Sequence, residues 1–265
     1  MSVGQVSARS RRADVTTYYA QHGEDRILSV LFSGRVSGVC VEVGAFDGVV
    51  NSNTLYFEER GWECLLVEAN PQLCEIIRKR RRARLAECAI SERAGVSHLV
   101  VGGGAEDLGT IESGAGQLAR IASGSQAVQT IEVETQTLDE VLEEAGIRNI
   151  DFISIDVEGH ELAALRGFDL GRWRPTVVIL ENNEHVESRR IATEMGKAGY
   201  RRVFRTGCND WYCHEADRGH GSFWRFWRRS GAPLGYRLLR AAGAVLLPRS
   251  FLTPMLRMKR WASGL

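Results

Sequence analysis

Short apolar runs separated by amphipathic stretches organise most of this chain. Several of the runs are apolar on both faces of an extended strand, which is typical of parallel strands that helices cover on both sides. Strands of this kind are predicted at residues 39–43, 64–67, 85–90, 150–156 and 176–180. Between the runs, apolar residues recur at helical spacing, so the pattern predicts an α/β fold.

Weaker signals predict the remaining elements. A strand is predicted at residues 128–134, a short extra strand at 96–101, and a hairpin that closes the sheet at 201–205 and 210–214. Helices are predicted at residues 21–32, 53–60, 71–84 and 186–198, with another beginning at Thr137. Residues 102–126, rich in Gly, Ala and Ser, have no strong periodicity, so they are interpreted as a loop that either covers the acceptor site or is disordered.

The first strand runs into the turn Gly44-Ala-Phe-Asp-Gly48, which is typical of a cofactor site. Glycine lets the backbone pass close to a ligand, and the polar residues 51–54 follow at the start of the next helix. The second strand ends about twenty residues later in Glu68, where a carboxylate can accept hydrogen bonds from a ribose. Phe46 stands where a dinucleotide site would have a second glycine, so a cofactor without a pyrophosphate is favoured.

Seven short motifs follow one another along the predicted sheet. They are Glu42-Val-Gly-Ala-Phe-Asp-Gly48, Ser52-Asn-Thr54, Gly61-Trp62, Val67-Glu-Ala-Asn-Pro71, Thr137-Leu-Asp139, Ile150-Asp-Phe-Ile-Ser-Ile-Asp-Val-Glu-Gly159 and Leu180-Glu-Asn-Asn183. In this order they resemble the FkbM family of S-adenosylmethionine-dependent methyltransferases, from about Gln21 to about His214. The resemblance implies a Rossmann-like class I methyltransferase fold, with a mostly parallel seven-stranded sheet and a terminal antiparallel hairpin.

The resemblance also implies which residues hold S-adenosylmethionine. Glu42, Gly44 and Gly48 would line its methionine end, Glu68 would bind the ribose, and Asp156 would share a rim with the methyl acceptor. The complete predicted cofactor set is Glu42, Gly44, Asp47, Gly48, Asn51, Ser52, Thr54, Glu68, Ala69, Ala89 and Asp156. For the segment around Ala89, a plain core strand is an equal alternative to contact with an adenine ring.

Two predicted strands end in oxygen-bearing side chains at one edge of the sheet. Asp156 follows one strand, and Glu181, Asn182 and Asn183 follow the other. Mg²⁺ prefers such oxygen ligands, so these four residues are predicted to hold an ion that would make an acceptor hydroxyl easier to deprotonate. The alternative is that the carboxylates cap helices or pair with Arg.

Three residues near this edge are candidates for catalysis, namely Asp156, Glu158 and His160. His160 has an ordinary pKa near neutrality, so it could take the proton of the hydroxyl. Structural roles are the alternative, because Glu158 could cap the helix that carries His160 and a lone His is more often structural. The methyl donor is already activated as a sulfonium, so alignment of the reactants could supply much of the rate.

Composition and charge divide the chain of 265 residues, of which 44% are hydrophobic, enough for one full-sized core. Residues 222–265 contain nine Lys or Arg and no Asp or Glu, which leaves 25 basic and 33 acidic residues elsewhere. We expect a flexible N-terminal arm (1–20), a methyltransferase domain (21–221) and a basic, aromatic, helical C-terminal extension (222–265). Six cysteines without secreted-type spacing, and no signal peptide, indicate a reducing, cytoplasmic location.

The C-terminal extension mixes aromatic and basic residues, which favours an anionic membrane surface at the cytoplasmic face. It could equally fold back on the acidic domain. The basic run 78–84 has no interleaved aromatic residues, so it is predicted to be a solvated helix end and nucleic acid is not predicted as a partner.

The predicted function is methyl transfer from S-adenosylmethionine to a hydroxyl of a sugar, glycan, glycolipid or glycosylated natural product, with Mg²⁺ as an assisting ion. Two other classes stay open. One is a nucleotide-dependent oxidoreductase on the same fold, which Phe46 disfavours. The other is a non-catalytic membrane-surface binding module, which the retained motif acids disfavour. The sequence does not fix the oligomeric state.

Overall fold

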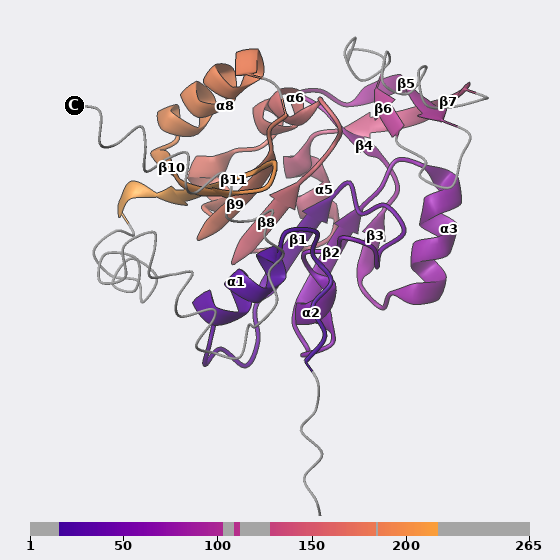
Figure 1. The fold of residues 1–265 in the computed structure, drawn as a ribbon. Helices are drawn as coiled ribbons and strands as arrows, with labels where there is room; N and C mark the ends of the chain where they lie inside the picture. The colour runs from indigo at the N-terminus through magenta and orange to yellow at the C-terminus, as the bar shows by residue number, and fades with distance from the viewer. Residues whose placement is uncertain (1–15, 103–108, 112–127, 184, 217–265) are drawn as a thin grey trace, which may run out of the picture.

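The computed structural model describes residues 16–102, 109–111, 128–183 and 185–216. A seven-stranded sheet forms its centre (Figure 1). Its strands, in spatial order, are β3 (Arg84–Ala86), β2 (Glu63–Val67), β1 (Val39–Val43), β8 (Phe152–Ile155), β9 (Val177–Glu181), β11 (Asn209–His214) and β10 (Tyr200–Thr206). The first five are parallel, and β11 is antiparallel to both of its neighbours. The predicted Rossmann-like class I methyltransferase fold is confirmed.

Helices cover both faces of this sheet. On one face α1 (Glu24–Leu31), α2 (Leu55–Glu58) and α3 (Pro71–Arg80) pack against side chains such as Cys40 and Leu66. On the other face α5 (Leu138–Glu144), α6 (Glu161–Arg166), α7 (Leu170–Trp173) and α8 (His185–Lys197) pack against the larger core cluster, which contains Val41 and Ile153. The central strands are therefore apolar on both faces, as the sequence pattern predicts.

A second sheet lies beside α3, in the order β4 (Ala89–Ile90), β7 (Val128–Gln136), β5 (Gly95–Gly102) and β6 (Gly109–Ile111) (Figure 1). The predicted strands at 96–101 and 128–134 are confirmed as β5 and β7. The single strand predicted at 85–90 is wrong. Its first half pairs with β2 and its second half with β7, so the chain crosses from one sheet to the other at Glu87 and Cys88.

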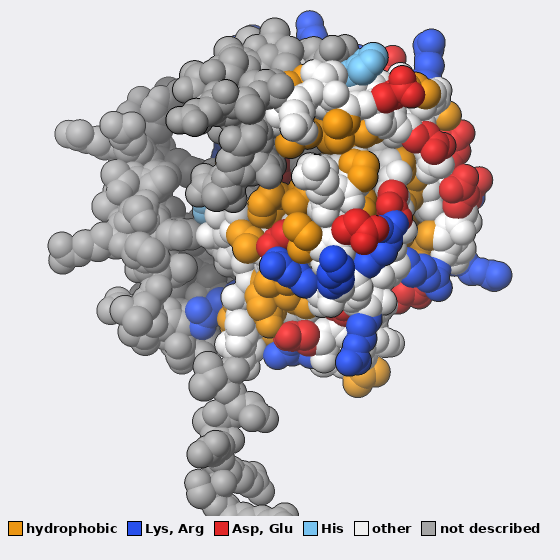
Figure 2. All heavy atoms as spheres, turned by 90° about the vertical axis from the view of Figure 1, so that its right-hand side faces the viewer, with side chains coloured by type: hydrophobic (Ala, Val, Ile, Leu, Met, Phe, Trp, Pro, Cys, Tyr) orange, Lys and Arg blue, Asp and Glu red, His pale blue; other side chains and the backbone are white. Residues whose placement is uncertain are grey.

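The helix predicted at 71–84 ends earlier, at Arg80, because Arg81 adopts an extended conformation. Its guanidinium is 0% exposed and pairs with Glu58 at 2.8 Å. The prediction of a wholly solvated basic run is therefore wrong at this position. The neighbouring Arg78 and Arg80 do form exposed or half-exposed ion pairs. Figure 2 shows one face of the molecule, on which basic and acidic side chains lie side by side.

Several predictions concern residues outside those that the structure describes. They are residues 1–15 of the N-terminal arm, the loop at 102–126 in all but residues 102 and 109–111, and the C-terminal extension at 222–265 with its membrane contact. Among the described helices, none is both long and apolar enough to span a membrane.

Candidate functional site

A cavity of about 580 Å³ opens at the carboxyl ends of the parallel strands. This is where open α/β sheets bind ligands. Its walls come from the ends of β1, β2, β8 and β9 and from the second sheet. The lining residues are Gln21, Glu42, Val43, Gly44, Ala45, Phe46, Val50, Asn51, Asn53, Val67, Glu68, Ala69, Asn70, Leu73, Cys88, Ala89, Ile90, Leu99, Ser154, Asp156, Val157, Glu158, Glu181, Asn183 and Cys208.

The lining changes character along the edge of the sheet. Beyond β2, toward the second sheet, it is mostly apolar, with Leu73, Ala89 and Leu99. Over β8 and β9 it is acidic, with Asp156 and Glu181. Among the described residues, no Lys or Arg lines the cavity. The cavity therefore offers an apolar slot at one end and a strongly anionic wall at the other.

The glycines of the first turn make space for protein rather than for a ligand. A Cβ on Gly44, which has φ 81°, would lie 1.7 Å from the backbone oxygen of Asp156. A Cβ on Gly48 would lie 2.9 Å from Cγ of Arg81. Gly44 thus brings the β1 turn into contact with the loop after β8, and Gly48 makes room for the buried Arg81. The sequence-based reason for these two glycines is corrected, although Gly44 does line the cavity.

Glu42 is buried at the end of β1 and is surrounded by donors. Its carboxylate accepts hydrogen bonds from Ser52 Oγ at 2.8 Å, from the Asn53 backbone N–H at 2.6 Å and from Thr54 Oγ. Arg81 Nη1 lies 3.9 Å away. Ser52 and Thr54 are outside the cavity lining, so these two predicted cofactor residues lie where they fix Glu42 and the turn.

Glu68 lies at the end of β2 and supports the opposite side of the same turn. Its two carboxylate oxygens accept the backbone N–H groups of Phe46 and Asn70, each at 2.9 Å. Burial raises the pKa of Glu68. Phe46 has φ 52°, a strained value for a residue with a bulky side chain, and the bond from Glu68 helps to hold it there. Glu68 lines the cavity, and each oxygen has a second lone pair available to a ligand.

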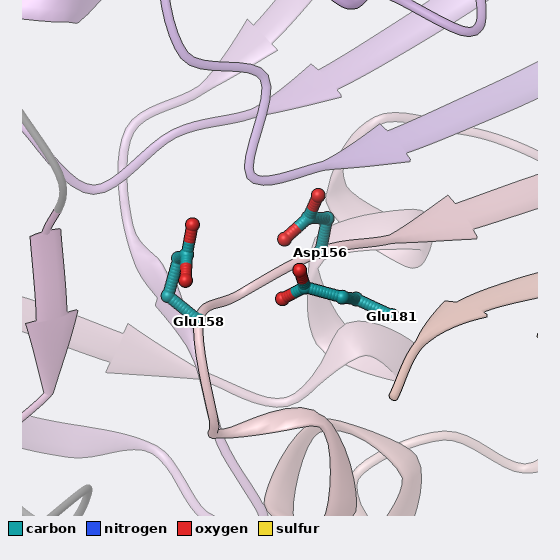
Figure 3. A group of neighbouring side chains, drawn as sticks. All are labelled: Asp156, Glu158 and Glu181. Carbon is teal, nitrogen blue, oxygen red and sulfur yellow. The ribbon is translucent and has the colours of Figure 1, made fainter. Parts of the chain in front are cut away.

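Three carboxylates converge at the other end of the cavity. Asp156 follows β8, Glu158 lies in the next loop, and Glu181 ends β9 (Figure 3). One oxygen of each lies within 4.8 Å of the others. Burial raises the pKa of Asp156 well above its usual range, and the Glu181 and Glu158 carboxylates raise it further. Such a group of like charges favours a shared proton or a bound cation.

The two predicted amide ligands behave differently. Asn183 lines the cavity, and its Nδ2 donates to Glu181 Oε1 at 2.6 Å. Asn182 is turned away from the cavity, because its Nδ2 donates to Asp210 Oδ2 at 2.6 Å and to Ser188 Oγ at 2.9 Å. The structure brings together three of the four predicted metal ligands, Asp156, Glu181 and Asn183, and adds Glu158.

Two other predicted site residues lie outside the cavity lining. His160 is part-buried, and its Nε2 lies 3.2 Å from Ser91 Oγ, while burial lowers its pKa. Asp47 accepts the backbone N–H groups of Val49 and Val50 and pairs with Arg80, so it stabilises the turn. The remaining predicted cofactor residues, Asn51, Ala69 and Ala89, do line the cavity.

Sequence reasoning missed several residues that line the cavity, chiefly Gln21, Asn53, Ser154 and Cys208. Asn53 and Ser154 both lie inside motifs that carry the family resemblance, and Asn53 stands between Ser52 and Thr54, which have predicted roles. A period-two reading of β8 offers a signal, since Ser154 and Asp156 lie on the same face of one strand. Cys208 comes from the turn between β10 and β11, and burial raises the pKa of its thiol to about 12.

Comparison with known proteins gives one informative match. Residues 42–202 match the family model of the methyltransferase FkbM domain. A search of curated proteins found no match. Among solved structures, the precorrin-6y C5,15-methyltransferase from Geobacter metallireducens is 12% identical, covers 71% of this chain and 84% of its own, and has a TM-score of 0.39. The ribosomal protein L11 methylase from Lactobacillus delbrueckii is 9% identical, with coverages of 72% and 76% and a TM-score of 0.37. These likenesses are too weak to bear on chemistry.

Proposed function

The chain belongs to the FkbM family of methyltransferases, and from this premise we propose that it transfers the methyl group of S-adenosylmethionine to a hydroxyl of a sugar, glycan, glycolipid or glycosylated natural product. Use of S-adenosylmethionine follows from the family. The choice of oxygen as the acceptor atom, and of a sugar as its carrier, is the proposal. The observation that carries it is the group of three carboxylates, Asp156, Glu158 and Glu181, at one end of the cavity.

The described residues fit the cofactor. The apolar slot near Ala89 and Leu99 suits an adenine ring, and Glu68 has free lone pairs for a ribose diol. The anionic wall suits the cationic part of the molecule, and the absence of Lys and Arg from the described lining fits a cofactor without phosphates. When bound, S-adenosylmethionine supplies a methyl group already activated for transfer by its sulfonium.

The protein then has to place an acceptor hydroxyl and remove its proton. Asp156 is the best-placed base, because it lines the cavity and its raised pKa makes its carboxylate a stronger base than an ordinary one. Glu158 and Glu181 stabilise the proton once it has arrived. Transfer then moves the hydroxyl proton to the carboxylate, forms the bond from oxygen to the methyl carbon and breaks the bond from that carbon to sulfur. S-Adenosylhomocysteine is the other product.

A divalent cation is the second way in which the same carboxylates could act. Asp156, Glu158, Glu181 and Asn183 would supply oxygen ligands of the kind that Mg²⁺ prefers. Bound there, the ion would lower the pKa of an acceptor hydroxyl. Asn182 is not included, because Asp210 and Ser188 already engage its side chain.

The test uses the purified chain with S-adenosylmethionine labelled in its methyl group and a cell extract as the source of acceptors. We expect a labelled product that withstands mild alkali, as a methyl ether does and a methyl ester does not. Calorimetry should show binding of S-adenosylhomocysteine and none of NAD. Asp156→Asn should lower turnover about 10²- to 10⁴-fold. A product labelled on nitrogen or carbon would contradict the proposal, as would full activity of this variant.

A further inference from the structure

One polar side chain in the cavity wall has a site that the protein does not satisfy. Asn53 is 8% exposed and lines the cavity. Its Nδ2 donates to Ser154 Oγ at 2.8 Å, and its backbone N–H donates to Glu42. Its Oδ1 is buried and has no hydrogen-bond partner, the one such side-chain atom among the described residues. A buried acceptor without a hydrogen-bond partner is energetically unfavourable.

The position of Asn53 in the sheet restricts what could satisfy it. Its partner Ser154 lies beside Glu42 in the register of β8 and β1. Asp156 follows Ser154 on the same face of β8, one step nearer the cavity mouth. Asn53 therefore lies between the apolar slot, where an adenine ring fits, and the three carboxylates, where an acceptor hydroxyl fits.

The charges around Asn53 favour a cationic donor. The neighbouring ionisable side chains in the lining, Glu42 and Asp156, are both acidic. An amide oxygen accepts hydrogen bonds only, so its partner must be a donor. In S-adenosylmethionine the group that is both cationic and a hydrogen-bond donor is the α-ammonium of the methionine part.

We propose that Asn53, held by Ser154, binds the α-ammonium of the cofactor through Oδ1 and so fixes the methionine end between β1 and β8. This inference rests on the proposed use of S-adenosylmethionine. The amides of Gln21 and Asn51 are left for the carboxylate of the same methionine part. Both line the cavity, and a bridge between Ala20 and Asn51 brings the two segments together.

The experiment measures binding of three adenosine thioethers by calorimetry. S-Adenosylhomocysteine carries both the ammonium and the carboxylate, 5′-(3-aminopropylthio)adenosine carries the ammonium alone, and 5′-methylthioadenosine carries neither. In Asn53→Ala, we expect the first two to bind about 10- to 100-fold more weakly, as befits the loss of one hydrogen bond to a charged group. Affinity for 5′-methylthioadenosine should change less than 2-fold.

Three results would overturn the inference. Equal weakening of all three ligands would make Asn53 a structural residue, and weakening of S-adenosylhomocysteine alone would assign it to the carboxylate. No weakening at all would remove it from the cofactor site. If Asn53→Ala does not fold, Ser154→Ala, which frees the amide without removing it, should weaken the same two ligands by several-fold. Failure of the wild-type protein to bind S-adenosylhomocysteine would instead refute the proposed function.

Discussion

At the β1 and β2 end of the cavity the buried carboxylates are surrounded by hydrogen-bond donors, whereas at the β8 and β9 end they face one another. Glu42 accepts three hydrogen bonds and has Arg81 nearby, and Glu68 accepts two backbone N–H groups. Asp156 has Glu181 and Glu158 as its charged neighbours, and both raise its pKa. Two groups of the same chemical type therefore have opposite electrostatic settings within one cavity.

This difference separates two roles. Glu42 and Glu68, with Arg81 and the turn that they hold, form a structural frame for the cavity, whereas the carboxylates around Asp156 form its reactive group. A carboxylate with its donors in place is held in one position, so Glu42 and Glu68 can fix the turn on which a cofactor lies. Carboxylates that repel one another are stabilised by protons or cations, so the group at Asp156 changes state when either arrives. The effect of a substitution on stability tests the role of the β1 and β2 end. The effects of pH, metal and substitutions on stability and turnover test the role of the β8 and β9 end.

The largest effect is expected from Arg81, which joins the parts of the frame. Its side chain pairs with Glu58 at 2.8 Å, donates to Gly48 and Thr54, and is 0% exposed. Replacing it in Arg81→Met leaves buried acids without their cation, so we expect unfolding in urea to show a loss of about 3–5 kcal/mol. The control is Arg78→Met in α3, the helix that ends just before Arg81, because the ion pairs of Arg78 are exposed and its loss of stability should be far smaller. Similar losses in both variants would mean that the network around Arg81 is not a frame.

The acidic half should respond to pH through Glu161. Burial raises its pKa to about 7 from an ordinary 4.5, while its carboxylate accepts the N–H groups of Val157 and Gly159. Between pH 4.5 and 7 the folded protein keeps a proton that the unfolded chain releases, so stability falls as the pH rises. At about 1.4 kcal/mol per pH unit this amounts to about 3 kcal/mol.

The matched variant Glu161→Gln keeps the shape and the acceptor oxygen of the side chain but cannot titrate. Its free energy of unfolding, measured from pH 4.5 to 7.5, should fall less steeply than that of the wild type. Asp156 shifts in the same direction, so part of the slope should remain in the variant. Parallel curves for the two proteins would show that Glu161 titrates normally.

How far the sequence could predict the two halves depends on the range of the forces involved. The strands β1, β8 and β9 were predicted well because their residues are apolar on both faces, which is a local pattern. Arg81 was mistaken for part of a solvated run because its burial depends on Glu58 and the turn at Gly48, which are distant in sequence. The crossing between the two sheets was missed for the same reason.

The candidate site divides in a similar way. The motifs led to Glu42, Glu68, Asp156 and Glu181, since strand ends in a parallel sheet meet at one edge. They could not show that Ser52 and Thr54 serve Glu42, because that requires the path of the turn. The role of Asn53 depends on which of its atoms finds a partner, and no spacing rule reveals it.

A divalent cation bound at the β8 and β9 end of the cavity should stabilise the folded protein, by a smaller amount than the effects above. If Mg²⁺ binds at Asp156, Glu158 and Glu181, a concentration ten times its dissociation constant should stabilise the protein by roughly 1.4 kcal/mol. The midpoint of thermal unfolding should rise with MgCl₂ in the wild type and stay unchanged in Glu181→Gln. NaCl at the same ionic strength is the control. An equal rise with NaCl would reduce the effect to screening of the carboxylates.

The smallest effect is expected from His160, and this prediction decides which residue acts as the base. The sequence indicated His160 because an imidazole titrates near neutral pH, but the side chain is outside the cavity lining and its Nε2 lies 3.2 Å from Ser91 Oγ. A general base must reach the proton that it removes, directly or through one water, and such a base contributes about 10²- to 10⁴-fold to the rate. Asp156 lines the cavity, where a bound acceptor would be within its reach. We therefore expect His160→Ala to lower turnover less than about 3-fold, with Ser91→Ala as the matched variant for the loss of their mutual contact. If His160→Ala instead lowers turnover 100-fold while Asp156→Asn stays active, the base is His160, at the start of α6. The carboxylates would then serve only to bind a cation or the acceptor.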